Sequence, residues 1–285
     1  MLYGTSKILD KKGLSDSKLL TSVLFNLFIS IPILLVYTVW NGELSASHFT
    51  ALGVVEALFA GILQFALGIL FLYASMKRVG AARASIMGGT QVVFAPVLSI
   101  LFFRERITLP LVLGTLIIFG GLALVSSSSP SPIRQKTVPK RTLQLGYIYG
   151  VLAGFFWGAS YPFSRVSTLD LGSAGTSSLF AYGFAVLAIF VILLLSRQEK
   201  KFEIPNRSKV YLSGSGALNV FGTLVRSTAL SLAPVVLVTP FASLSPLPAV
   251  LLSYLIIQKV ELINRKVIAG AIAVVSGAVI IAALA

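Results

Sequence analysis

Apolar residues fill nine long runs of the sequence, and short polar loops separate these runs. With a window of about 20 residues, the length that crosses a bilayer as a helix, the runs cover 19–40, 51–74, 81–103, 108–127, 143–164, 174–196, 209–230, 235–257 and 265–285. The apolar residues surround each run instead of marking one stripe, as in helices that face lipid. The pattern predicts an all-α polytopic membrane protein with nine full transmembrane spans.

The sequence also repeats itself. Three landmarks recur at a constant offset of 156 residues: Glu105, Gly114 and Gly121 against Glu261, Gly270 and Gly277. Near the start, Tyr3 and Gly4 parallel Trp157 and Gly158. Three residues precede Gly4, whereas more than a dozen helical residues precede Gly158, so we expect most of helix 1 to be missing from a ten-helix arrangement.

A polar linker is predicted between the two copies. Residues 128–142 are rich in Ser, Pro and basic side chains, a composition typical of a connecting segment. The sequence thus predicts a first repeat over 1–127, with a truncated helix 1, and a second repeat over 143–285.

The basic residues favour opposite insertion of the two repeats. When the helices are numbered as if helix 1 were complete, 19 of the 23 Lys and Arg residues fall on loops 1–2, 3–4, 5–6, 7–8 and 9–10. Basic loops face the cytoplasm in most membrane proteins. Five helices per repeat then require an inverted pair, the arrangement that gives many secondary transporters alternating access.

Composition excludes several other classes of protein. Hydrophobic residues make up 56% of the chain and charged residues 11%, against about 25% in soluble domains. The net charge of +14 is therefore interpreted as basic cytoplasmic loops, and we expect a lipid bilayer rather than nucleic acid as partner. The chain has no Cys and one His, His48, and no nucleotide-binding Gly-Lys-Ser loop. We expect no cofactor, no metal site and no enzymatic activity.

Several motifs resemble a known family. The stretches 73–83 (YASMKRVGAAR) and 102–108 (FFRERIT), followed by Gly114 and Gly121, are similar to the EamA module of the drug/metabolite transporter (DMT) superfamily. The second repeat is similar but more diverged. The resemblance implies a ten-helix permease with helices 1–4 and 6–9 around a central cavity and helices 5 and 10 at the periphery. It also implies transport of small metabolites, often the export of amino acids.

One branch of that superfamily is not supported. The small multidrug transporters carry an intramembrane Glu three residues before the helix-1 glycine, whereas Met1 and Phe155 occupy these positions here. Proton-coupled drug export through that carboxylate is therefore not expected.

Two ionisable residues lie clearly inside predicted spans, Glu56 and Arg226. Such residues cost at least about 2.5–3.5 kcal/mol to insert, which makes them candidates for function. They occupy the corresponding helix of the two repeats, at similar depth. One hypothesis is that Arg226 binds a substrate carboxylate while Glu56 binds its amine or forms a gate with Arg226. The alternatives are a structural salt bridge, or two charges that reach the interface separately.

Further polar and aromatic residues accompany this pair. Gln64 falls near the face of Glu56, and Asn219 lies seven residues before Arg226 on one helical face. For the aromatic candidates Trp157 and Tyr161, the alternative to substrate binding is helix packing or a belt of aromatic residues at the membrane interface. The full set of candidate substrate-binding residues is Glu56, Gln64, Gln91, Trp157, Tyr161, Ser164, Asn219 and Arg226. Lys7, at the end of the helix-1 remnant, is predicted to be a cytoplasmic anchor.

Prolines and glycines suggest where helices bend and pack. The predicted kink or gating positions are Pro96, Pro240, Pro246 and Pro248. A proline frees a backbone carbonyl, which can face a cavity or merely shape a static kink. Glu105 and Glu261 are expected at the membrane interface. The glycines of helices 5 and 10 favour close packing, and a homodimer through these two helices is an alternative use of them.

Together these features predict a secondary transporter of the cell membrane. The expected activity is movement of small metabolites such as amino acids or organic acids by alternating access, in the direction of export. The alternative is a membrane scaffold or accessory subunit that transports nothing, which the truncated helix 1 favours.

Overall fold

A computed structural model describes residues 2–44, 49–103, 108–126, 139–196, 203–242, 248 and 265–284. In these residues the chain is helical throughout, apart from turns and short connections. The helices are α1 (Leu2–Gly13), α2 (Leu19–Trp40), α3 (Ala51–Gly61), η2 (Ile62–Gly68), α4 (Ile69–Val79), α5 (Ala81–Gly88), α6 (Gln91–Phe103), α7 (Leu109–Ser126), α9 (Lys140–Asp170), α10 (Ala174–Leu195), α11 (Asn206–Leu232), α12 (Val235–Ala242) and α14 (Arg265–Leu284).

Some predicted features lie outside the described residues. They are His48, Glu105, Glu261, Pro246, most of the predicted linker and most of the second half of the predicted span 235–257. The end of the linker is described, and it is helical, since α9 begins at Lys140.

The predicted spans and the observed helices agree in several places and differ in others. The helix α2 covers the predicted 19–40, while 51–74 becomes one helical run of α3, η2 and α4 that continues to Val79. The predicted span 81–103 is divided into α5 and α6 at Gly89 and Thr90. Within the described residues, four segments are long and apolar enough to cross a membrane by length and composition: Leu19–Trp40, Ala51–Val79, Arg83–Leu101 and Ala174–Leu195.

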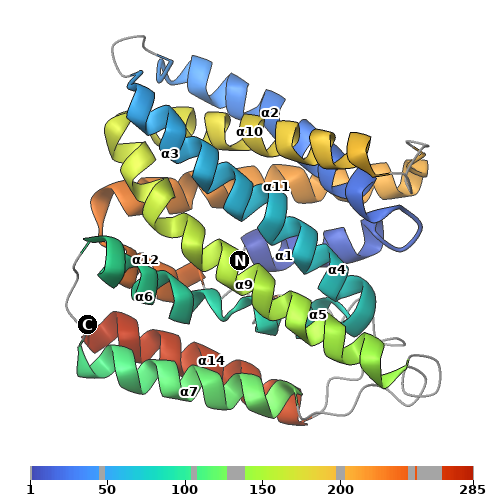
Figure 1. Ribbon diagram of the computed structural model, residues 1–285, viewed down its shortest axis with the longest axis vertical. Helices are drawn as coiled ribbons and strands as arrows, with labels where there is room; N and C mark the ends of the chain where they lie inside the picture. Colours follow the sequence, from blue (N-terminus) through green and yellow to red (C-terminus); the bar gives the residue numbers. More distant parts are fainter. Residues whose placement is uncertain are drawn as a thin grey trace.

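The long helix α9 forms the centre of the bundle. Its 31 residues pack against α3, η2, α4, α5 and α6, and Figure 1 shows it running obliquely across the middle of the molecule. On one side of it, α2, α10 and α11 pack together, and α1 lies along α11 and begins near the middle of the molecule. Fully buried side chains such as Leu27, Tyr73 and Tyr182 join these helices in one apolar core. The apolar core beside α9 is thus built from helices of both halves of the sequence.

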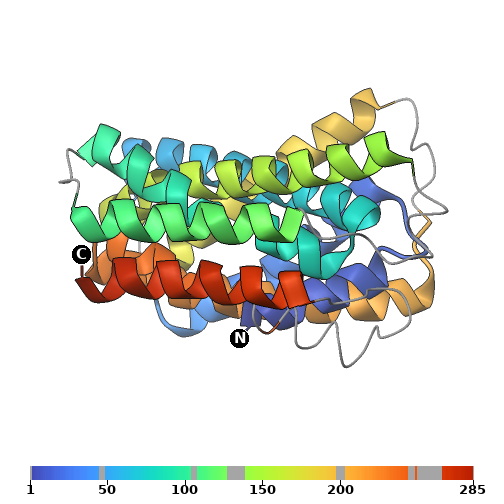
Figure 2. The ribbon, with the colours of Figure 1, turned by 90° about the horizontal axis from the view of Figure 1, so that it is seen from below.

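The helices α7 and α14 form a pair at one edge of the bundle, side by side in Figures 1 and 2. Glycines allow this approach. A Cβ atom on either Gly114 or Gly277 would lie 2.5 Å from the carbonyl oxygen of the other, and one on Gly121 would lie 2.7 Å from that of Gly270. Small residues let membrane helices approach in this way. We call this contact the α7–α14 seam.

The outer faces of the bundle are apolar. Exposed side chains include Trp40 on α2, Leu101 on α6, Leu195 on α10 and Leu232 on α11. Soluble monomers rarely expose apolar surface on this scale, whereas lipid-facing surfaces do so routinely. The described exterior therefore suits a bilayer.

Candidate functional site

A cavity lies inside the bundle, lined by side chains from α1, η2, α4, α6, α9, α10, α11 and α12. It leaves about 60 Å³ for the centres of water-sized molecules, several times the ~10–15 Å³ that one water needs. Aromatic, aliphatic, polar and charged side chains share its wall. We refer to it as the central cavity.

Six of the eight predicted site residues meet in this cavity. They are Gln64, Gln91, Trp157, Tyr161, Asn219 and Arg226. They come from four elements, η2, α6, α9 and α11. Gln91 is the first residue of α6, so the break in the predicted span 81–103 places a helix N-terminus, with its partial positive charge, at the cavity.

Arg226 is the most unusual of these side chains. It is 6% exposed, and its guanidinium lies over the ring of Tyr161, 5.0 Å from the ring centroid. A hydrogen bond also joins it to Tyr161. Nε and Nη1 of Arg226 are buried without a hydrogen-bond partner. Because a buried charge is costly unless it is paired, this guanidinium is suited to hold an anionic group that enters the cavity.

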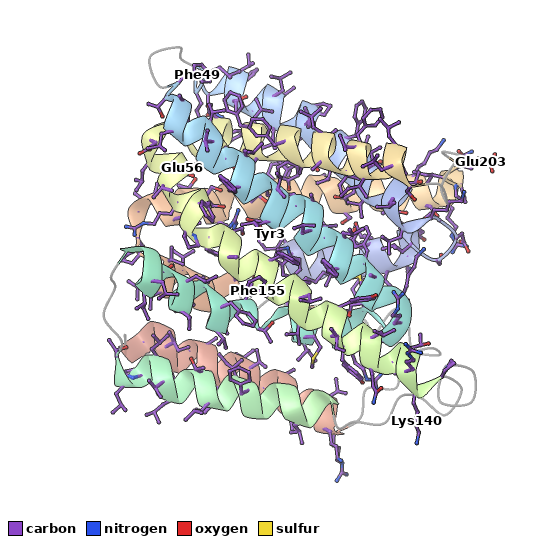
Figure 3. The ribbon with its side chains drawn as sticks, viewed as in Figure 1. Tyr3, Phe49, Glu56, Lys140, Phe155 and Glu203 are labelled. Carbon is purple, nitrogen blue, oxygen red and sulfur yellow. The ribbon has the colours of Figure 1, made fainter. Side chains whose placement is uncertain are left out.

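Glu56 is not brought to Arg226. Glu56 lies in α3 and hydrogen-bonds to Asp170, the last residue of α9. Figure 3 shows Glu56 toward the same end of the molecule as Phe49, whereas Tyr3 of the central cavity lies near the middle. Glu56 lies in α3 and Gln64 lies within the π-helix η2, so a face counted along a regular α-helix does not carry from one to the other. In this structure Glu56 and Arg226 therefore do not form the hypothesised pair, and a substrate-binding role for Glu56 stays a prediction.

Ser164 is also outside the central cavity. It is buried in α9, and its carbonyl oxygen accepts a hydrogen bond of 2.8 Å from the Thr168 hydroxyl. Of the three predicted site residues on α9, Trp157 and Tyr161 thus line the cavity wall, and Ser164 does not. The third lies further along the helix, among packed residues.

One face of α1 lines the cavity, a feature that the sequence reasoning missed. Tyr3, Ser6, Lys7 and Asp10 follow the spacing i, i+3, i+4, i+7 of a single helical face and all line the cavity. Lys7 is 5% exposed, and its ammonium lies 5.2 Å from the ring centroid of Trp157. Lys7 is therefore not the cytoplasmic anchor that we predicted, because its side chain turns inward from the short helix.

Asp10 is held by donors from several helices. The Tyr73 hydroxyl of α4 donates a hydrogen bond of 2.5 Å to Asp10 Oδ1, and Asn26 Nδ2 of α2 donates one of 3.4 Å to the same oxygen. Ser215 of α11 also hydrogen-bonds to Asp10, and Lys7 adds an electrostatic contact. Asp10 is 2% exposed. It ties α1 to three other helices at the cavity wall.

Hydroxyl groups lie close to Arg226. Thr223 Oγ1 is 3.2 Å from the Tyr3 hydroxyl and 3.3 Å from the Tyr182 hydroxyl. Thr223 lies four residues after Asn219 and three before Arg226, so all three share one face of α11. This spacing could have revealed Thr223, since Asn219 and Arg226 already marked the face.

Trp157 is fixed in the wall by the π-helix and by glycines. Its Nε1 donates a hydrogen bond of 3.1 Å to the carbonyl oxygen of Gln64, while the Ser160 hydroxyl donates one of 3.0 Å to Gln64 Oε1. The indole lies against Gly68 and Gly88, where a Cβ atom would come within 2.5 Å and 2.9 Å of it. π-helical turns are rare and concentrate at functional sites, and here the turn offers a carbonyl to the indole.

The prolines are only partly placed. Pro96 is buried inside α6, which continues through it to Phe103, and Pro240 lies within α12, whose last residue, Ala242, lines the cavity. Pro248 lies beyond α12 and is helical, and the residues on either side of it are outside the described part of the chain. A gating role for these prolines stays a prediction.

Within the described residues, no group of three or more His, Cys, Asp or Glu side chains could hold a metal ion.

Comparisons with known proteins identify a family. The model of the EamA-like transporter family matches residues 1–127 and 144–283. A solved crystal structure has a similar fold, with a TM-score of 0.68 over 100% of this chain and 96% of its own, at 14% identity. Among curated proteins, no significant match is found.

Proposed function

Because this chain belongs to the EamA-like transporter family and is a multi-pass membrane protein rather than an enzyme, we propose that it moves small carboxylate-bearing metabolites through the central cavity by alternating access. Amino acids and organic acids are the classes considered, and export across the cell membrane is the proposed direction. The transporter has no nucleotide-binding loop in its sequence, so we propose secondary transport, driven by a gradient or by exchange.

The buried guanidinium of Arg226 is the observation that carries this proposal. It lies in the cavity wall with Nε and Nη1 free of hydrogen-bond partners. Hydroxyl groups of Tyr3, Tyr182 and Thr223 lie nearby and can donate to a carboxylate. Arginine pairs with carboxylates through two parallel hydrogen bonds, which fixes the orientation of the bound group.

The proposed mechanism uses two inverted repeats, 1–127 and 143–285, joined by the linker 128–142. The basic loops would face the cytoplasm. In this scheme the two repeats exchange conformations around the cavity and open it to either side in turn. Contacts between α1 and α11, and between α9 and the α3–α4 run, join residues of both repeats around the cavity, which supports a site between them.

The test is counterflow of labelled solutes into proteoliposomes that contain purified protein. The labelled pool combines amino acids and organic acids, and Arg226→Gln is compared with the wild type. A hydrogen bond to a charged group contributes about 1.5–3 kcal/mol, so uptake should fall by about tenfold to a hundredfold. The matched control is Arg207→Gln, which removes an exposed cation from the same helix, α11, outside the cavity. Its uptake should equal that of the wild type.

Two results would contradict the proposal. Equal uptake by the wild type and Arg226→Gln would keep transport but remove Arg226 from the binding site. Absence of uptake for every solute in the pool would favour the scaffold or accessory subunit.

A homodimer through helices α7 and α14 stays a prediction. The glycines that suggested it already pack α7 against α14 within one chain. A dimer would therefore have to use the outer faces of this pair, where Gly120 has open space around it.

A further inference from the structure

Three charged side chains line the described wall of the central cavity: Lys7, Asp10 and Arg226. Two of these side chains are positively charged and one is negatively charged. A solute can bind only to a charge that the protein has not already paired. Arg226 is such a charge, since two of its nitrogens lack partners. An amino acid would also need an acceptor for its ammonium group, and Asp10 is the one carboxylate in the described wall.

The carboxylate of Asp10 is already surrounded by donors. Tyr73, Asn26 and Ser215 hydrogen-bond to it, and Lys7 lies one turn before it on the same face of α1. It is 2% exposed. An ammonium group could reach it only by displacing donors that tie four helices together. Asp10 therefore does not serve as the ammonium acceptor.

Three aromatic rings of the cavity wall already have a cation or a second ring over one face. Lys7 lies over the ring of Trp157 and Arg226 over the ring of Tyr161. The ring of Tyr182 is stacked by Phe65, with centroids 3.9 Å apart. Cation–π binding requires an open ring face, and one face of each of these three rings is already covered. The resident cations instead repel an incoming ammonium group.

No other acidic side chain lines the described wall of the cavity. Glu56, the acid that the sequence suggested for this role, hydrogen-bonds to Asp170 outside the cavity. The stretch 243–264, which follows α12 in the sequence, contains one acidic residue, Glu261. The described wall thus carries two cations, one carboxylate that is already hydrogen-bonded, and neutral hydroxyl and amide groups.

We propose that the solute is a small carboxylate without an ammonium group, such as a 2-oxo or 2-hydroxy acid, and that the cavity rejects the α-amino acid of the same carbon skeleton. This inference rests on the proposed function, since it assumes that Arg226 binds the carboxylate. It narrows the two classes considered there to organic acids.

The experiment compares solutes that differ only at the second carbon. Pyruvate, lactate and alanine form one set, and 4-methyl-2-oxopentanoate and leucine form another. Each is offered in counterflow to proteoliposomes with wild-type protein or Arg226→Gln. The oxo and hydroxy acids should be taken up at least about tenfold faster than the amino acids, because like-charge contacts discriminate strongly. Arg226→Gln should lose that uptake.

A second variant tests the cause of the selectivity. Asn219→Asp adds a carboxylate to the wall with little change in shape, since Asn219 lines the cavity seven residues before Arg226. It should raise alanine uptake relative to pyruvate by about tenfold. Asn219→Ser, which removes the amide without adding charge, is the matched control and should leave the ratio unchanged. Size-exclusion profiles in detergent verify that both variants are folded.

The outcomes separate this inference from the function on which it rests. Faster uptake of amino acids that still depends on Arg226 would overturn the inference and keep the transporter. An unchanged ratio in folded Asn219→Asp would also overturn it, since charge would then not set the selectivity. Absence of uptake for all five solutes, by wild type and variant alike, would overturn both.

Discussion

Glycines allow close packing in both the central cavity and the α7–α14 seam, but the side chains around these glycines differ between the two regions. In the seam, Gly114 and Gly277 bring two helices together, and the neighbouring side chains, such as Ile118 and Val274, are apolar and fully buried. In the cavity, Gly68 and Gly88 seat the indole of Trp157, while Arg226 stays buried with two nitrogens unpaired. The seam therefore contributes stability alone, whereas the cavity retains an energetic cost that a bound solute can relieve.

This contrast predicts opposite responses to substitution. Changes in the seam should alter the stability of the fold and leave transport by folded protein intact. Changes at Arg226 should alter transport and leave the fold intact or more stable. Four substitutions, taken from the largest expected effect to the smallest, test this separation.

Arg226→Met should abolish transport and stabilise the protein at the same time. Replacing buried ionic groups by apolar residues of similar volume often stabilises by about 1–4 kcal/mol, although loss of the cation–π contact with Tyr161 offsets part of this gain. Thermal unfolding in detergent and counterflow are measured on the same preparation. A lower unfolding temperature would show that Arg226 is part of the structural core.

Gly121→Ala should destabilise the seam by about 1–3 kcal/mol, because the added methyl group overpacks a close contact. It would lie 2.7 Å from Gly270 O and 2.9 Å from Ala273 Cβ. The adjacent Gly120 has nothing within 4 Å, so Gly120→Ala is the control and should be neutral or stabilising by up to about 1 kcal/mol. Equal unfolding temperatures for the two variants would mean that the seam tolerates a wider spacing.

Trp157→Phe should cost about 0.5–1.5 kcal/mol, since it removes the hydrogen bond to the π-helical carbonyl of Gln64. The matched control is Trp40→Phe, because Trp40 is 87% exposed on α2. Thermal unfolding should separate the two variants. If both unfold like the wild type, the indole N–H does not support the π-helix.

Thr223→Val should reduce counterflow by a factor of about two to ten, the effect of one lost hydrogen bond. The hydroxyl joins Tyr3 and Tyr182 beside Arg226. Thr228→Val, at an exposed position of the same helix, should transport like the wild type. A loss that is equal in both variants would point to helix α11 as a whole and not to the hydroxyl cluster.

The sequence predicted the cavity residues best where polarity was most costly. Gln64, Gln91, Asn219 and Arg226 stand out because they interrupt apolar runs, and all four line the cavity. Glu56 interrupts such a run equally well. Hydropathy shows that a polar residue lies within a span, but it does not show which residue contacts it. The partner of Glu56 is Asp170, which is too distant in the sequence to be identified from the pattern.

Two other features, the break between α5 and α6 and the inward face of α1, could not be predicted from hydropathy alone. The division between α5 and α6 occurs at Gly89 and Thr90, inside an apolar run that reads as one helix. The polar face of α1 was visible as the spacing of Tyr3, Ser6, Lys7 and Asp10. We assigned Lys7 to the cytoplasm because basic residues at helix ends usually lie there, and this preference concealed the inward face.

The placement of Trp157 also provides an optical signal. The chain contains two tryptophans, and Trp40 is exposed on the outer surface of α2. In a Trp40→Phe protein, all indole emission would therefore arise from the wall of the central cavity, next to the ammonium group of Lys7. A solute that enters changes the polarity and charge around that ring, so fluorescence titration would measure binding directly, without label and without reconstitution into vesicles.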